Sequence, residues 1–147
     1  MSAIDELYQE LVIDHGRNPR NFGKLAHATH IKEGYNPLCG DQITLYIVEK
    51  DNVVKDIKFD GHGCAISMAS ASLMTEALKG KTIEFVDQLF HAFQDCVTGE
   101  TSDTKNLGKL AILSGVRRFP MRVKCATLPW HTAKAALRDD KGDISTE

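Results

Sequence analysis

The stretch GHGCAISMASASLMTEALK, residues 61–79, decides how this chain folds. After its two glycines and Cys64, the segment is rich in small residues, compatible with a helix and nearly uncharged. A helix of this composition has few faces suited to water, so we expect it to be buried with other elements packed around it. Gly80 is suited to the C-terminal cap of that helix.

Two strands are predicted upstream of this helix. Apolar residues alternate with Thr44 and Tyr46 over residues 43–47, which is the period of a half-buried strand. A second apolar run covers residues 53–59, and the pair Asp51-Asn52 between the two runs is typical of a turn. We therefore expect an antiparallel hairpin.

Helices are predicted on both sides of these strands. Apolar residues at three- and four-residue spacing predict amphipathic helices over 3–15 and 83–97. Pro120 is suited to the first position of a further helix. The other expectations are mostly loop over 16–40 with at most a short edge strand near 25–31, loop over 98–105, a short helix over 107–116, a break at Pro129, and a last helix through Trp130, Ala133 and Leu137.

The order of the predicted elements indicates the fold class. A helix, then strands, then several helices is typical of the α+β class, here a small antiparallel sheet of about three strands packed against several helices. We find no internal repeat and no linker in the sequence, so we expect a single domain over residues 1–138. A charged tail over residues 139–147 is expected to be disordered.

The composition narrows the class of protein. Hydrophobic residues make up 42% and charged residues 26% of the 147 residues, and the net charge is -2, so we expect no general attraction to nucleic acid or to a membrane. The N-terminus has no basic region followed by an apolar run, and no stretch reaches the length of a membrane span. We therefore expect a cytoplasmic location, where cysteines more often serve as metal ligands, reactive thiols or core residues than as disulfides.

Three cysteines and one aspartate form the candidate site: Cys39, Asp41, Cys64 and Cys125. They are spread over most of the chain, so only a folded domain could bring them together. Three thiolates and a carboxylate supply the four ligand atoms that a tetrahedral zinc ion or a small iron–sulfur unit needs.

The neighbours of these residues favour ligand roles. Asp41 lies two residues after Cys39, so in extended chain both side chains would point to the same face. Cys64 begins the buried helix, where the helix dipole favours a thiolate, and Arg122 and Lys124 favour one at Cys125. Taken one at a time, each cysteine could equally be a small buried side chain, and Asp41 a turn residue.

Other candidate residues have simpler interpretations. Cys96 lies on the apolar side of the helix predicted over 83–97, where a buried thiol is usually inert. His62, beside Cys64, could be a ligand or a loop residue in solvent. His15, just before Gly16, is interpreted as a cation at a helix C-terminus.

Four motifs carry a resemblance to a known family. They are DHGRNPRN at 14–21, CGD at 39–41, GHGCAISMASAS at 61–72 and FPMRVKCATLPW at 119–130. In this order they resemble the IscU/SufU family of iron–sulfur cluster assembly proteins, which is NifU N-terminal-like, from Leu7 to about Leu137.

Two details resemble the SufU branch of that family. Lys124 stands where the IscU branch usually has His immediately before the third cysteine. The stretch between Cys64 and Cys125 is also longer than in the IscU branch and includes residues 99–108. Pro129 departs from the Ser or Ala common in related chains.

The resemblance implies ligands, a nucleophile and a partner. It implies a zinc ion held by Cys39, Asp41, Cys64 and Cys125. It implies that Cys39 accepts sulfur from a pyridoxal-phosphate-dependent cysteine desulfurase of the SufS type, after a histidine of that enzyme displaces Cys39 from the zinc. Arg122 would then hold the released thiolate.

Three functions follow from these observations, in this order. The first is a zinc-dependent sulfurtransferase that serves downstream iron–sulfur assembly proteins. The second is a scaffold on which iron and sulfide form a nascent [2Fe–2S] cluster, because thiolates bind iron and zinc alike. The third is a structural zinc site in an adaptor domain, against which the carboxylate ligand argues mildly. Sequence leaves open whether Cys39 or Cys125 carries the persulfide.

Overall fold

The computed structural model of the chain describes residues 3–101, 104–105, 107–138 and 144–145. Within these residues the elements follow the order α1 (Ala3–Arg17), β1 (His30–Asn36), β2 (Asp41–Lys50), β3 (Val53–His62), α2 (Ala65–Leu78), α3 (Ile83–Thr98), the 3-10 helix η1 (Gly108–Arg118), α4 (Pro120–Leu137) and β4 (Ile144–Ser145). The predicted α+β class is confirmed.

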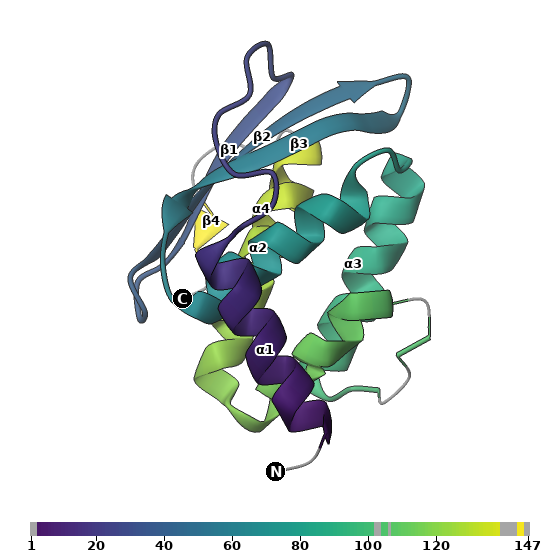
Figure 1. Ribbon diagram of the computed structural model, residues 1–147. Coiled ribbons are helices and arrows are strands. Elements are labelled where there is room, and N and C mark those ends of the chain that lie inside the picture. Colours follow the sequence, from purple (N-terminus) through teal and green to yellow (C-terminus); the bar gives the residue numbers. More distant parts are fainter. Residues whose placement is uncertain (1–2, 102–103, 106, 139–143, 146–147) are drawn as a thin grey trace.

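The sheet has the strand order β3-β2-β1-β4 (Figure 1). β1, β2 and β3 are antiparallel neighbours, while the two residues of β4 pair in parallel with Gly34 and Tyr35 of β1. The predicted hairpin is present as β2 and β3, and its turn residues Asp51 and Asn52 both have positive φ. Such angles match the right-handed twist of the flanking strands, which explains why this pair closes the hairpin.

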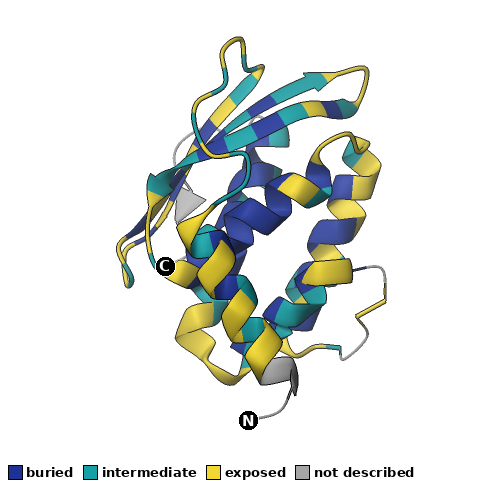
Figure 2. Ribbon diagram, in the orientation of Figure 1, coloured by how far each residue is buried: buried dark blue, intermediate teal, exposed yellow. Residues whose placement is uncertain are grey.

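Helix α2 lies at the centre of the molecule and is buried along most of its length (Figure 2). It contacts α1, α4 and β3, while α4 also contacts β1 and β2, so α2 and α4 together cover one face of the sheet. Two of the three buried serines of α2, Ser70 and Ser72, have hydrogen-bond partners for their hydroxyls, whereas the hydroxyl of Ser67 has none among the described residues. Ser70 donates to the carbonyl of Ala126 at 2.5 Å and accepts from the indole of Trp130 at 3.1 Å.

Two features of the fold differ from the sequence expectations. The first strand covers residues 30–36 and is longer and later than the edge strand expected near 25–31. Pro129 lies inside α4 and does not break it. A proline inside a helix costs about 3 kcal/mol, and packing offsets this cost, because Leu128 and Trp130 are buried and the indole of Trp130 stacks on Phe93.

Two residues of the C-terminal tail belong to the sheet. In the tail expected to be disordered, Ile144 and Ser145 pair with β1, and the other residues of 139–147 lie outside the described part of the chain. No helix in the described ranges combines the length and the apolar character needed to cross a bilayer.

Candidate metal centre

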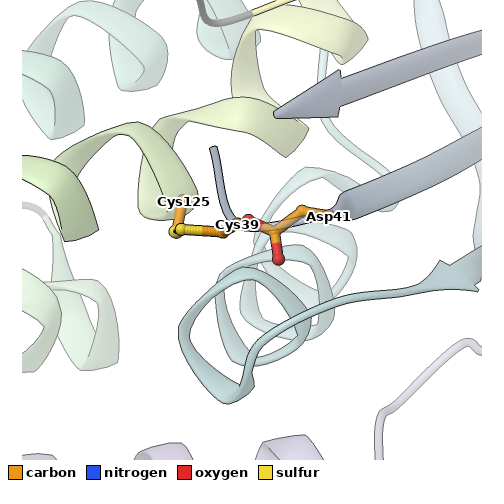
Figure 3. A group of neighbouring side chains, drawn as sticks. All are labelled: Cys39, Asp41 and Cys125. Atoms are coloured by element: carbon orange, nitrogen blue, oxygen red, sulfur yellow. The ribbon is translucent and has the colours of Figure 1, made fainter. Parts of the chain in front are cut away.

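Cys39, Asp41 and Cys125 come together in the folded chain (Figure 3). One ligand atom from each of the three residues lies within 4.8 Å of the others. The Sγ atoms of Cys125 and Cys39 are 3.3 Å apart. The fold therefore unites three of the four predicted ligands, which are separated by up to 86 positions in the sequence.

Cys39 lies in the four-residue turn that joins β1 to β2. Its backbone N–H donates to the carbonyl of Asn36 at 3.3 Å, and the next residue, Gly40, has a φ of 71°. This left-handed conformation favours glycine. The expected extended chain from Cys39 to Asp41 is therefore wrong in detail, because a turn brings the two side chains together.

Asp41 is the first residue of β2 and is 1% exposed. Its Oδ1 accepts a hydrogen bond of 2.7 Å from the backbone N–H of Cys64, which fixes the orientation of the carboxylate. Gly63 lies so close that an added Cβ would be 2.6 Å from Oδ1. The absence of a side chain at Gly63 therefore makes room for the carboxylate.

Cys64 is the N-cap of α2, as predicted from its position before the small-residue helix. Its Sγ accepts from the N–H of Ser67 at 3.5 Å and lies 3.9 Å from Oδ2 of Asp41. A hydrogen bond from Cys125, together with the backbone donors of α2, lowers the pKa of Cys64 to about 7. Cys64 thus borders the cluster of three and could complete a four-ligand set.

Cys125 lies in the second turn of α4 and is fully buried. Its pKa is raised because its thiol donates to Cys64 and because burial disfavours the charged form. The burial of Cys125 therefore disfavours a free thiolate at this position.

Arg122, the second predicted catalytic residue, is exposed in the first turn of α4. Its pKa is raised, first by the charge of Cys64 and then by a hydrogen bond with Cys125, so its guanidinium lies beside the thiols. Arg122 and Cys64 both line a surface groove of about 680 Å³, whose other lining residues include Tyr8, Val12, Phe119 and Met121. One side of the cluster is thus reached from the surface.

Asn36 is a member of the site that sequence reasoning missed. It is fully buried at the end of β1, and its Nδ2 contacts both Oδ2 of Asp41 at 3.4 Å and Sγ of Cys125 at 3.5 Å. In the sequence, an asparagine before Pro37 indicates only a turn. The strand register between β1 and β2 reveals its place in the site, because Asn36 pairs directly with Asp41 there.

The remaining candidates lie away from the cluster. Cys96 is fully buried in the core, as predicted, where Arg117 donates to its Sγ at 3.4 Å. His62 is exposed at the end of β3. His15 lies in the last turn of α1, as predicted, but its surroundings disfavour the predicted cation. Its ring is buried and bonded to Ser72 at 2.7 Å, and burial lowers its pKa.

The donor set fits a thiophilic metal. Thiolate sulfur and carboxylate oxygen are zinc ligands, and thiolates also hold iron–sulfur units. Asp41 and Cys125 are both buried with nearby N–H donors, a setting that preserves ligand geometry when the metal exchanges. Cys39, Asp41 and Cys125 are thus consistent with a metal site.

Comparison with known proteins identifies relatives over most of the chain. Residues 7–126 match the family described as NifU-like N terminal domain. The chain is 43% identical over 140 residues to the zinc-dependent sulfurtransferase SufU of Bacillus subtilis, covering 95% of both chains. It is also 43% identical over 132 residues to the iron–sulfur cluster assembly scaffold protein IscU of Thermotoga maritima, covering 90% of this chain and 93% of that one.

A solved structure agrees with the fold. The crystal structure of the SUF-system protein FiSufU from Fervidobacterium islandicum superposes with a TM-score of 0.85 at 37% identity, covering 90% of this chain and 97% of that one. Because the sulfurtransferase and the scaffold of the preceding comparison are equally similar to this chain, overall identity does not choose between their two activities.

Proposed function

The chain belongs to the NifU-like N-terminal domain family and is an iron–sulfur cluster assembly protein, and from this premise we propose that it is a zinc-dependent sulfurtransferase that accepts persulfide sulfur through Cys39. Its sulfur donor is a cysteine desulfurase of the SufS type, which carries its own pyridoxal phosphate. The sulfur then passes to downstream iron–sulfur assembly proteins in the reducing cytoplasm.

The observation that carries this proposal is the unequal way in which the fold holds the ligands. Cys125 and Asp41 are buried in regular elements, and Cys64 is fixed as the cap of α2. Cys39 is half-buried in a turn next to a glycine with a left-handed backbone. A turn can move without disturbing a helix or a sheet, so Cys39 is the ligand best placed to leave.

The chemistry of the transfer follows from this arrangement. A zinc ion held by Asp41 and by Cys39, Cys64 and Cys125 would keep the three cysteine thiols deprotonated. Once a histidine of the desulfurase has taken the place of Cys39 on the metal, the Cys39 thiolate attacks the outer sulfur of the persulfide on the desulfurase. A sulfur–sulfur bond forms at Sγ of Cys39, the bond within the donor persulfide breaks, and the donor cysteine leaves as a thiolate.

The surroundings of the site support a protein partner. The guanidinium of Arg122 lies beside the thiols, where a charge-assisted contact can hold the released Cys39 thiolate. Leu38, Phe119 and Met121 lie close to the ligands in sequence and are each more than half exposed. Exposed apolar side chains of this kind are typical of an interaction surface.

A stimulation assay tests the proposal. Adding the zinc-loaded protein to a SufS-type desulfurase should raise the rate at which alanine is formed from cysteine, and Cys39→Ala should abolish the increase. Cys96→Ala is the matched control, because it removes a buried thiol outside the site and should preserve the increase. Full stimulation by Cys39→Ala would contradict this sulfur relay, in which Cys39 accepts sulfur from the desulfurase and passes it on.

A scaffold function is the second candidate, favoured by the equal identity to the Thermotoga maritima scaffold protein. In this case Cys39, Cys64 and Cys125 would hold a nascent [2Fe–2S] cluster as cargo. Anaerobic reconstitution with iron and sulfide, followed by transfer to an apo-ferredoxin, tests it. A cluster that does not form, or that resists transfer, would count against the scaffold.

A further inference from the structure

Asn36 makes contacts that distinguish the ligands from one another. Its Nδ2 donates to Oδ2 of Asp41 at 3.4 Å and to Sγ of Cys125 at 3.5 Å. Its link to Cys39 is made by the backbone, whose carbonyl accepts from the N–H of Cys39 at 3.3 Å. The side-chain amide thus connects one ligand on the sheet with one on α4.

The position of Asn36 makes these contacts stable. Its Cα is paired with that of Asp41 in the β1–β2 register, and its side chain is fully buried. Asp41 is held from the other side by the N–H of Cys64. Asp41 and Cys125 therefore share a buried donor that is out of contact with bulk water while β1 and β2 stay paired.

The oxygen atom of the same side-chain amide shows that an asparagine at this position lowers the stability of the fold. Its Oδ1 is buried and has no hydrogen-bond partner among the described residues. An unsatisfied buried acceptor costs about 1–3 kcal/mol, which an apolar side chain of the same size would avoid. The hydrogen bonds that offset this cost are the two contacts of its Nδ2, at the candidate metal ligands.

We propose that Asn36 is a positioning residue that fixes the order in which cysteines leave the metal. By bridging Asp41 and Cys125 it joins them into one anchor, and Cys39, outside this bridge, becomes the ligand that departs. This inference rests on the proposed function, because an order of departure matters only if one cysteine must be released for transfer.

Competitive alkylation of the zinc-loaded full chain tests the inference. Limiting iodoacetamide is added, and the initial modification rates of Cys39 and Cys125 are measured by mass spectrometry of their peptides. In the unsubstituted protein Cys39 should react first. Asn36→Leu keeps the number and branching of the side-chain heavy atoms, is somewhat larger, and removes both donors. It should reduce the ratio of the two rates about 10-fold, the lower end of the effect on metal affinity or activity that residues orienting metal ligands have.

A control separates this role from general destabilisation. Ile47→Val removes one methylene from a buried position of β2 and leaves the ligand set untouched. It should leave the ratio of rates unchanged, because a loss of stability as small as that of one buried methylene keeps the protein folded and does not alter the contacts of Cys39 or Cys125. If circular dichroism shows that Asn36→Leu does not fold, the smaller and strand-compatible Asn36→Val is used with the same expectation.

The outcomes of this experiment separate the two proposals. If Cys39 reacts first in the unsubstituted protein and equally strongly first in the Asn36 variant, the role of Asn36 is overturned while the sulfur relay stands. If Cys39 has no preference in the unsubstituted protein, the relay itself is contradicted. A reduced ratio in the Asn36 variant, with Ile47→Val unchanged, supports the inference.

Discussion

The turn that carries Cys39 and the helix that carries Cys125 bring two sulfur atoms to within 3.3 Å, yet they hold them differently. Cys125 is fully buried in α4, where an amide, two thiols and a carbonyl surround it. Cys39 lies half-buried between Leu38 and Gly40, which are both exposed. Two chemically identical ligands at one site can therefore have different lifetimes on a metal, set by the elements behind them.

The strongest test of this comparison removes each thiol in turn. Cys125→Ala should weaken zinc binding by more than about 100-fold, because it removes a ligand that the fold holds in place. Cys39→Ala should weaken binding less, because Asp41, Cys64 and Cys125 remain. Competition with a chromophoric chelator gives both affinities. Equal losses in the two variants would remove the distinction between anchor and leaving ligand.

A smaller loss of zinc affinity is expected from a substitution at Gly63, which lies against the carboxylate of Asp41. Gly63→Ala should weaken zinc binding about 10-fold, because the new Cβ would lie 2.6 Å from Oδ1 of Asp41 and displace the carboxylate. Gly99→Ala is the control, since Gly99 caps α3 with a φ of 84° and an added Cβ there would meet no described atom within 4 Å. The prediction fails if the two variants bind zinc alike.

The protonation of His15 should make the stability of the fold depend on pH. Burial lowers its pKa from the ordinary 6.5, so the unfolded chain binds this proton more tightly than the folded one. The resulting stability is present above about pH 6.5 and is lost as the pH falls. Arg20, Glu76, Asp14 and Lys109 are the charged groups that face the ring.

Urea unfolding of the zinc-free protein at pH 7.5 and pH 5.5 measures this effect. His15→Gln should reduce the difference in unfolding free energy between the two pH values, whereas His62→Gln, at an exposed position, should preserve it. An unchanged difference in His15→Gln would show that α1 is not held on α2 by a neutral imidazole.

Removal of zinc should have the smallest effect on the fold. The core formed by α2, α4 and the sheet extends well beyond the ligands, so the metal-free protein should keep its far-ultraviolet circular dichroism and unfold cooperatively. Loss of structure on chelation would instead support the structural zinc adaptor, in which metal binding energy is folding energy.

The sequence predicted those parts of the fold in which side chains follow simple patterns. The alternation over 43–47 and the Asp51-Asn52 turn gave the hairpin, and small residues around Cys64 indicated a buried helix with a thiol at its start. These features depend on local periodicity and composition, which a single sequence contains.

The sequence prediction placed β1 too early along the chain, because this strand buries polar residues and a glycine and exposes its apolar residues. Its buried positions are Lys32, Gly34 and Asn36, while Ile31 and Tyr35 are exposed at 60% and 42%. Gly34 is buried because Thr132 of α4 occupies the space of a Cβ. Asn36 is buried by the site itself. Both causes are tertiary contacts, which no local pattern reveals.

The sequence predicted three residues that the fold brings together, Cys39, Asp41 and Cys125, but it did not predict the residues that contact them. Flanking glycines pointed to Cys39 and Cys64, but the roles of Asn36 and His15 depend on partners 89 and 57 positions away. Pro129 was interpreted as a break for the same reason, because the packing that offsets its cost comes from Trp130 against α3 and α2. Long-range contacts therefore account for most of the errors.

The direct pairing of Asn36 with Asp41 also restricts how this chain can change in length. One residue inserted between them would either lengthen the turn that carries Cys39 or shift the register by one, and a shift of one residue turns every following side chain to the opposite face of the sheet. In the first case Cys39 would move relative to Asp41, and in the second Asp41 would point away from Cys125. The described residues between α3 and η1 contribute no ligand to the cluster of Cys39, Asp41 and Cys125, so changes of length at those residues are compatible with the same chemistry.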